Sequence, residues 1–195
     1  MTQQVTDPVA SKAVFDREIA EYRENEGEYR KLGWLLLEAE YPRVLVVMAA
    51  AHLLPAPVLF GLALDYTNYP VEPPALRFVD PFTGEEVPFD KLPNHLLRGE
   101  KLAMPAILAP QGMNAEAVVP RNELVLQHHG GPAILCHPGV REYHEHPAHT
   151  GDAWELHAGE GRLNRLLDIV YRFGIRPVQA QVQLTVVYPQ TAPGI

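Results

Sequence analysis

The sequence predicts a single α+β domain over residues 1–195: an N-terminal helix, an antiparallel four-stranded meander sheet, an irregular insert, and a C-terminal helix followed by one extra strand. Two observations support this fold class. None of the 19 prolines lies between Val9 and Tyr41 or between Ala148 and Arg176, so these stretches are the helix candidates. Between them, apolar runs follow one another through short links, which is typical of an antiparallel meander.

The first proline-free stretch predicts an amphipathic helix over residues 8–31. Asp7 can cap its N-terminus, and Pro8 suits its first turn. We expect the helix to be weakened at Gly27, because glycine disfavours a helix interior. The apolar residues that recur at helical spacing are Phe15, Ile19, Tyr22 and Tyr29.

Four apolar runs predict the meander, which we place at residues 33–80. Turn-forming prolines separate the first three runs: Pro42 follows the first, and a Pro-Ala-Pro turn follows the second. The expected strands cover residues 34–41, 43–51, 58–66 and 75–80.

The rest of the chain predicts less regular structure. Prolines recur through residues 81–132, so we expect an irregular insert there. Leucines at helical spacing predict a helix over residues 160–174, with Gly174 as its left-handed cap. Alternating apolar and polar residues predict a half-exposed strand over residues 177–188.

Composition and charge exclude several classes of partner. The formal net charge is −8, and this field repels nucleic acid. The longest apolar stretch, residues 44–64, is interrupted by proline, glycine and histidine, so we expect no membrane-spanning helix. The N-terminus lacks the features of an export signal, and Cys136 has no second cysteine to pair with. We therefore expect a cytoplasmic protein.

The order of elements resembles the ubiquitin-conjugating enzyme fold. The likeness rests on residues 58–66, on Tyr69-Pro70 followed by Pro73-Pro74, and on residues 75–79. In that family, a Tyr-Pro pair followed by a Pro-Pro pair leads the chain from the third strand into the fourth. The spacing here has one extra residue, and the likeness covers roughly residues 8–82 together with the first helix.

The same resemblance implies a role for the cysteine. In ubiquitin-conjugating enzymes the catalytic cysteine follows the fourth strand and precedes a helix, and Cys136 has this place in the order. The family's His-Pro-Asn, which precedes its cysteine, has no counterpart here, since His137-Pro138-Gly139 follows Cys136 instead. The resemblance implies that Cys136 is catalytic and that the partners are a ubiquitin-like protein and its activating enzyme.

A second resemblance covers residues 136–154. This segment is similar to a bacterial family of predicted metal-binding proteins that is named for a cysteine, a glutamate and two histidines. The genes of that family accompany components of ubiquitin-like conjugation. Both resemblances therefore imply one pathway of protein modification in bacteria.

The segment over residues 133–157, which we call the site segment, is rich in metal-binding side chains. Seven of the nine histidines of the chain fall within 30 residues, beside the only cysteine. A structural zinc site needs about four ligands from thiolate, imidazole and carboxylate. The residues that we expect to hold zinc are Cys136, Glu142, His146 and His149, with His144 and Glu145 as alternates.

Other interpretations of the same residues stay open. Cys136 could be a nucleophile activated by a nearby imidazole, or a small buried side chain among histidines of ordinary surface loops. The protein could also be a noncatalytic zinc-binding interaction module of the same pathway. His144-x-His146-Pro147 further resembles the motif of zinc isopeptidases, although the serine and aspartate that follow it in those enzymes are missing at their spacing.

Overall fold

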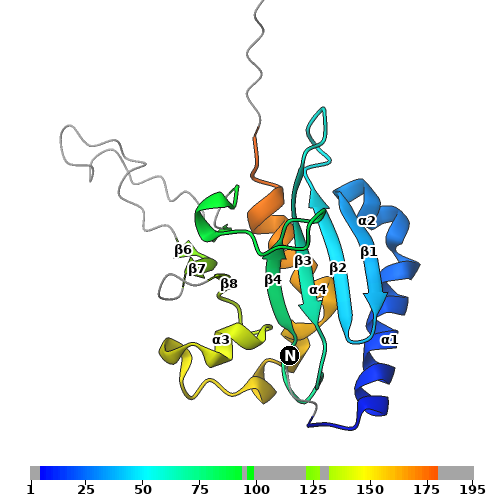
Figure 1. Cartoon of the computed structure of the whole chain (residues 1–195), viewed down its shortest axis with the longest axis vertical. Coiled ribbons are helices and arrows are strands. Elements are labelled where there is room, and N and C mark those ends of the chain that lie inside the picture. The colour runs from blue at the N-terminus through cyan, green and yellow to red at the C-terminus, as the bar shows by residue number, and fades with distance from the viewer. Residues whose placement is uncertain (1–4, 94–95, 99–121, 128–131, 180–195) are drawn as a thin grey trace, which may run out of the picture.

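The computed structural model describes residues 5–93, 96–98, 122–127 and 132–179. Its centre is an antiparallel sheet in the order β1 (Trp34–Glu40), β2 (Arg43–Ala49), β3 (Val58–Asp65) and β4 (Ala75–Val79). The helix α1 (Pro8–Glu24) lies beside β1, and α4 (Leu163–Val170) lies behind the sheet (Figure 1). The predicted α+β architecture, with a four-stranded meander between two helices, is confirmed.

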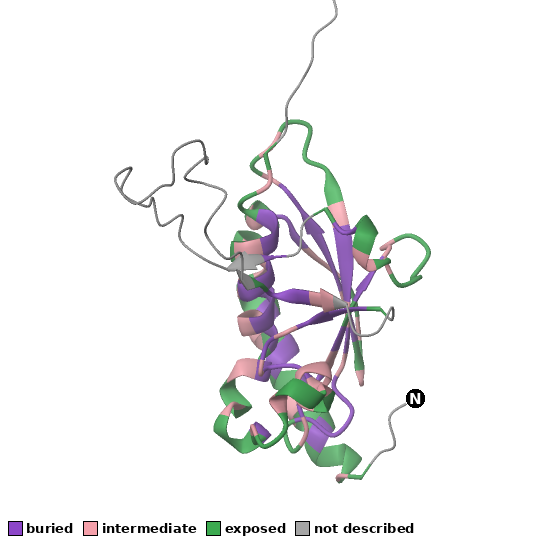
Figure 2. Ribbon diagram, turned by 90° about the vertical axis from the view of Figure 1, so that its left-hand side faces the viewer, coloured by how far each residue is buried: buried purple, intermediate pink, exposed green. Residues whose placement is uncertain are grey.

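The core lies where one face of the sheet meets the helices. The strand register pairs Val46 with Leu62 and Leu62 with Phe78, and all three side chains are buried. They belong to one apolar cluster with Tyr22 of α1 and Leu166 of α4. Figure 2 shows buried residues along the central strands. Burial of this face is the main stabilising term, because each large apolar side chain contributes about 1.5–3 kcal/mol.

The predicted N-terminal helix is interrupted at Asn25 rather than weakened at Gly27. As expected, the Asp7 side chain caps α1 by accepting a hydrogen bond of 2.9 Å from the Val9 N–H. After α1, the Asn25 amide donates to the Glu21 carbonyl at 3.0 Å, and the chain leaves helical geometry for one residue. A side chain that bonds the backbone competes with the helix in this way. A second helix, α2 (Glu26–Leu32), then continues past Gly27.

Gly33 sets the angle at which the chain enters the sheet. It ends α2 in a left-handed conformation with φ of 86°. A Cβ atom at this position would lie 2.1 Å from the Ala49 carbonyl oxygen, so the close approach of the two strands needs glycine. The Ala49 N–H donates to the Gly33 carbonyl at 2.8 Å and fixes the start of β1 against the end of β2.

The insert predicted to be irregular contains short regular elements in its described part. A 3-10 turn, η1 (Phe89–Lys91), is followed by β5 (Leu97–Arg98), which pairs with β6 (Asn122–Glu123). A second ladder joins β7 (Val125–Gln127) to β8 (Ala133–Leu135). The prolines in the described part of the insert, Pro81, Pro88, Pro93 and Pro132, lie outside these short strands. Residues 94–95, 99–121 and 128–131 lie outside the described part.

The C-terminal helix is present with a different end from the one predicted. A 3-10 turn, η6 (Ala158–Gly161), precedes α4, and a π-helical turn, η7 (Tyr171–Ile175), follows it. Gly174 belongs to this turn and is not left-handed. A Cβ atom on Gly174 would lie 3.0 Å from the Leu96 side chain, so the glycine allows close packing rather than capping. Most of the strand predicted at 177–188 lies outside the described residues.

A buried carboxylate joins the two helices. Glu18 of α1 is 2% exposed and accepts a hydrogen bond of 3.1 Å from the Leu163 N–H at the start of α4. The Arg162 guanidinium lies 3.7 Å from the same carboxylate and also contacts Glu21. Burial raises the pKa of Glu18, and these partners offset only part of that rise. Glu18 therefore acts as a cap for α4 that is supplied from another helix.

We expect Glu18→Ala to lower the free energy of unfolding by about 1–2 kcal/mol, because the Leu163 N–H loses its acceptor. Glu18→Gln keeps an acceptor and cannot ionise. A raised pKa means that the folded state binds the proton more tightly than the unfolded state does, so the contribution of Glu18 falls as pH rises above its ordinary value of 4.5. As pH rises above this value, the free energy of unfolding should fall less for Glu18→Gln than for the native chain, which denaturant unfolding at several pH values measures. Equal free energies of unfolding for Glu18→Gln and the native chain at every pH would contradict this role.

Candidate functional site

Cys136 lies at the end of β8, beside the fourth strand of the main sheet. All three residues of β8 are buried, and this strand packs against β4 as well as β7. The Cys136 N–H donates to the Leu124 carbonyl at 2.6 Å, which continues the pairing by one residue. The side chain of Cys136 itself is half-buried. The thiol is thus held at a fixed point of the fold and remains partly accessible.

The chain after Cys136 folds back over the thiol. It forms α3 (Arg141–Glu145) and the 3-10 turns η4 (Pro147–His149) and η5 (Trp154–Leu156), on the β4 side of the sheet (Figure 1). Trp154 is buried, and its indole N–H donates to the Pro70 carbonyl at 2.8 Å. The end of the site segment is therefore anchored to the Tyr69-Pro70 turn that leads into β4.

The sulfur of Cys136 contacts an imidazole. Cys136 Sγ lies 3.4 Å from Nε2 of His149, within hydrogen-bond distance for sulfur. Burial raises the pKa of the Cys136 thiol. The pKa of His149 is lowered, first by burial and then by the nearby His146. Near neutral pH the two groups are therefore a thiol and a neutral imidazole, not an ion pair.

A series of contacts connects His149 to Tyr143, Asp152 and His157. Its ring stacks on Tyr143, with centroids 3.8 Å apart and planes 20° apart. The Tyr143 hydroxyl donates to Asp152 Oδ2 at 2.7 Å, and the other oxygen of Asp152 lies 2.8 Å from Nε2 of His157. These two hydrogen bonds lower the pKa of Asp152. Burial and, second, the bond to Asp152 raise the pKa of Tyr143 to about 12, so the phenol stays protonated.

The other predicted metal ligands have different surroundings. Glu142 accepts a hydrogen bond of 3.2 Å from the Leu76 N–H, and burial raises its pKa. The ring nitrogens of His144 lie 3.0 Å from the Asp152 carbonyl and 2.9 Å from the Pro138 carbonyl. The structure thus ties Glu142 to β4 and His144 to two loops, while it brings Cys136 and His149 together.

The remaining candidates lie at the edge of the site. His146 precedes η4, and its Nδ1 accepts a hydrogen bond of 3.2 Å from the Ala148 N–H. Its ring centroid lies 5.6 Å from that of His149. Glu145, the alternate carboxylate, is exposed at the end of α3.

Comparison with known proteins identifies relatives across nearly the whole chain. The family model of the Y4jH family matches residues 6–178. The chain belongs to the Y4jH-like family. It is 35% identical over 187 residues to the uncharacterized protein y4jH of Sinorhizobium fredii (strain NBRC 101917 / NGR234), and the match covers 94% of this chain and 91% of that relative. The site segment falls inside the region that the family model matches.

The side chains of this Y4jH-like protein that could bind metal do not all converge. Among the described residues, no group of three or more histidine, cysteine, aspartate or glutamate side chains has the spacing of a metal site. Of the predicted ligands, Cys136 and His149 are in contact, at a separation that suits two ligands of one ion. Zinc binding therefore stays a prediction, and Glu142 and His144 would have to leave their present hydrogen bonds to take part in it.

Tyr143 was not predicted to belong to the site, although it precedes two candidate histidines in the sequence. Its spacing of six residues from His149 fits no single helix or strand, so the stack is visible only once α3 ends and η4 turns back. His157 was counted among the clustered histidines, but its contact with Asp152 could not be assigned from the sequence.

None of the described helices is long and apolar enough to cross a membrane.

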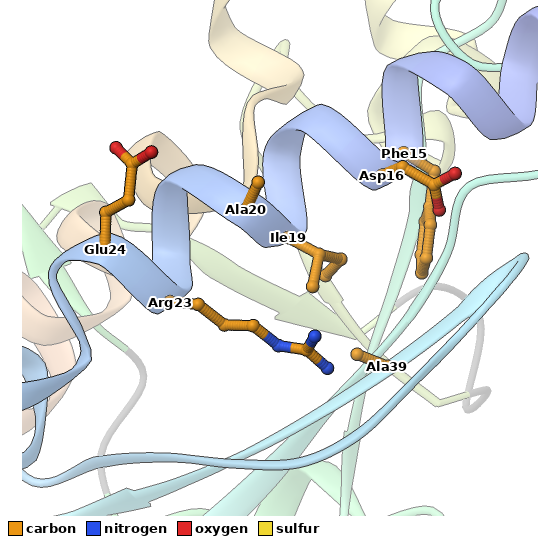
Figure 3. Close-up of a pocket in the computed structure, with 7 residues that line it drawn as sticks. All are labelled: Phe15, Asp16, Ile19, Ala20, Arg23, Glu24 and Ala39. Atoms are coloured by element: carbon orange, nitrogen blue, oxygen red, sulfur yellow. The ribbon is translucent and has the colours of Figure 1, made fainter.

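A separate groove lies between α1 and β1 of this Y4jH-like protein (Figure 3). It has a volume of about 610 Å³. Figure 3 shows the Arg23 side chain reaching from α1 toward Ala39, whereas Glu24 points away. The residues that line it are Phe15, Asp16, Ile19, Ala20, Arg23, Glu24 and Ala39. It contains no cysteine or histidine, so the nucleophile and metal candidates are not part of it.

The raised pKa of Cys136 predicts slow alkylation near neutral pH. Only the thiolate reacts, so the rate constant with iodoacetamide should rise with pH and reach half its maximum above about pH 8.5, the value of a free cysteine. A short peptide that contains one cysteine is the control, measured in parallel. A midpoint for the folded protein below that of the peptide would show that the thiol is activated, contrary to the surroundings described above.

Proposed function

We propose that this protein is a ubiquitin-conjugating-enzyme-like component of a bacterial ubiquitin-like modification pathway, and that Cys136 carries the ubiquitin-like protein as a thioester. One observation carries the proposal: the half-buried sulfur of Cys136 lies 3.4 Å from Nε2 of His149. A fixed, partly exposed thiol beside a proton acceptor is the minimum that thioester exchange requires.

The arrangement of the fold supports the same proposal. An N-terminal helix, a four-stranded meander and a proline-rich turn precede the cysteine in the order that the resemblance to ubiquitin-conjugating enzymes implies. β8 packs against β4 and places Cys136 beside the sheet, and Trp154 ties the following segment to the Tyr69-Pro70 turn. The cysteine thus depends on the same elements that carry the resemblance.

The contact between sulfur and imidazole suits the chemistry of transfer. The carrier would arrive as a thioester on its activating enzyme. As the Cys136 sulfur attacks the carbonyl carbon, a new C–S bond forms and the bond to the activating enzyme's sulfur breaks. His149 Nε2 accepts the Cys136 proton, which then passes to the departing thiolate, so that charge and atoms balance.

The direct test is formation of a covalent adduct. Purified protein is incubated with a bacterial ubiquitin-like protein, its activating enzyme and ATP, and the products are separated without reductant. We expect an adduct that disappears on reduction and is absent in Cys136→Ala, because that variant lacks the attacking sulfur. His149→Ala should form it at least about 10-fold more slowly, since a positioned base commonly contributes that much or more. If no adduct forms with any carrier that the activating enzyme loads, the transfer proposal is wrong.

A second candidate function is zinc binding by a noncatalytic interaction module of the same pathway. One observation favours it: two ligands of a tetrahedral zinc with ordinary Zn–S and Zn–N distances lie about 3.6 Å apart, close to the 3.4 Å between Cys136 Sγ and His149 Nε2. When bound, zinc would link Cys136 to His149 and stabilise the site segment between them. A zinc-bound thiolate is not available for thioester formation, so the two candidates exclude each other at one time.

Elemental analysis of the tag-free protein, purified without chelator, separates the two candidates. The zinc candidate predicts about one ion per chain, with loss of the ion in Cys136→Ala and in His149→Ala. Glu142→Gln should retain it, because Glu142 accepts a hydrogen bond from the Leu76 N–H rather than facing the thiol. Less than about 0.2 zinc per chain, unchanged in all three variants, would count against this candidate.

A further inference from the structure

We propose that Tyr143 and Asp152 are positioning residues, which hold the His149 imidazole against the Cys136 sulfur through a ring stack and a phenol–carboxylate hydrogen bond. The inference rests on the proposed use of Cys136 as a nucleophile and assigns roles to two residues that act on the sulfur through His149. It is argued from the contact between Cys136 and His149 and from three further contacts that form a closed loop around η4.

His149 needs such support, because its own element holds it weakly. It ends a 3-10 turn of three residues, and Pro147, Ala148, Thr150 and Gly151 around it are exposed. The His149 N–H donates to the His146 carbonyl at 3.0 Å, a bond within the same turn. Short exposed turns with few apolar contacts are among the less stable parts of a fold. The turn alone would not fix the imidazole relative to Cys136.

Tyr143 fixes the plane of the imidazole. The rings stack with centroids 3.8 Å apart and an angle of 20°, so rotation of His149 away from this plane would lose the contact. Stacked rings of this kind stabilise one another beyond the burial of area alone. Tyr143 itself comes from α3, which packs against β4 and β8. The stack therefore positions His149 relative to β8, the strand that Cys136 directly follows.

Asp152 in turn fixes Tyr143 and closes the loop. Its carboxylate accepts a hydrogen bond of 2.7 Å from the Tyr143 hydroxyl, and its other oxygen lies 2.8 Å from Nε2 of His157, which follows η5. Its own N–H donates to the His149 carbonyl at 3.1 Å. The stack, the phenol–carboxylate bond and this backbone bond thus connect His149, Tyr143 and Asp152 in a ring, so that a change at Tyr143 or Asp152 shifts the imidazole that faces the sulfur.

The test follows Cys136 alkylation by iodoacetamide, which needs neither a carrier nor an activating enzyme. The quantity compared is the ratio of the rate constants at about pH 7.5 and about pH 10, because at the higher pH the rate reports mainly access to the thiolate. Tyr143→Phe keeps the stack and removes the tether, and Asp152→Asn removes the charge at nearly constant shape. We expect each to lower the ratio at least about 3-fold, in the same direction as His149→Ala.

A double-mutant cycle distinguishes positioning from general damage. If Tyr143 acts through His149, then Tyr143→Phe changes the ratio by less than about 2-fold when His149→Ala is already present. Glu155→Gln is the matched control, since it neutralises an exposed carboxylate of the same segment, and it should leave the ratio unchanged. Circular dichroism and thermal melting check each fold. Should Tyr143→Phe not fold, the same cycle is run with Asp152→Asn.

The inference is overturned if Tyr143→Phe and Asp152→Asn leave the ratio unchanged, or if their effects persist in full in the His149→Ala background. Its fate is independent of the transfer assay. A protein that forms no thioester but shows the coupled alkylation ratios retains the positioning role and loses the proposed function. A protein that forms the thioester and shows no coupling loses the positioning role alone.

Discussion

The packing of β8 against β4 is the constraint on which the candidate site depends. The three residues of β8 are fully apolar and buried, so this short strand is held by the core although it belongs to a two-stranded ladder. Cys136 follows it directly, and α3 packs against the same pair of strands. Without this contact, neither the sulfur nor the stack behind His149 would have a fixed place. The site is thus built on the edge of the main sheet rather than on a free loop.

The protonation states at the site follow from its partial burial. Desolvation disfavours charge, so it raises the pKa of the Cys136 thiol and lowers that of His149. The resting pair is neutral, and its proton moves only when a reacting group approaches the sulfur. The negative charge of the site lies instead on Asp152, whose carboxylate accepts hydrogen bonds from Tyr143 and His157. A pair of this kind suits exchange between thioesters, which needs no strong base, and limits unwanted alkylation and oxidation of the thiol.

The sequence predicts the sheet well because its strand signals are local. Prolines and apolar runs place all four strands within two residues of their observed ends, and Asp7 caps the first helix as expected. Two contacts that the sequence pattern does not reveal, one local and one between distant residues, decide the features that were predicted wrongly. The break at Asn25 depends on a side-chain bond to Glu21, and Gly174 serves packing against Leu96. Clustering of histidines beside the single cysteine predicts a ligand set that contains both Cys136 and His149, but it does not single out this pair, and the bond from Leu76 to Glu142 joins residues 66 positions apart.

The proposed site depends on the contact, within hydrogen-bond distance, between the Cys136 sulfur and the His149 imidazole in the folded protein. The most direct test is a pH titration of the His149 ring nitrogens by two-bond proton–nitrogen NMR, in the native chain and in Cys136→Ala. The account predicts that His149 titrates below about pH 6.5, the ordinary value, and that its midpoint and Nε2 shift change when the sulfur is removed. Identical His149 titrations in the two proteins would contradict the contact and, with it, the proposed site.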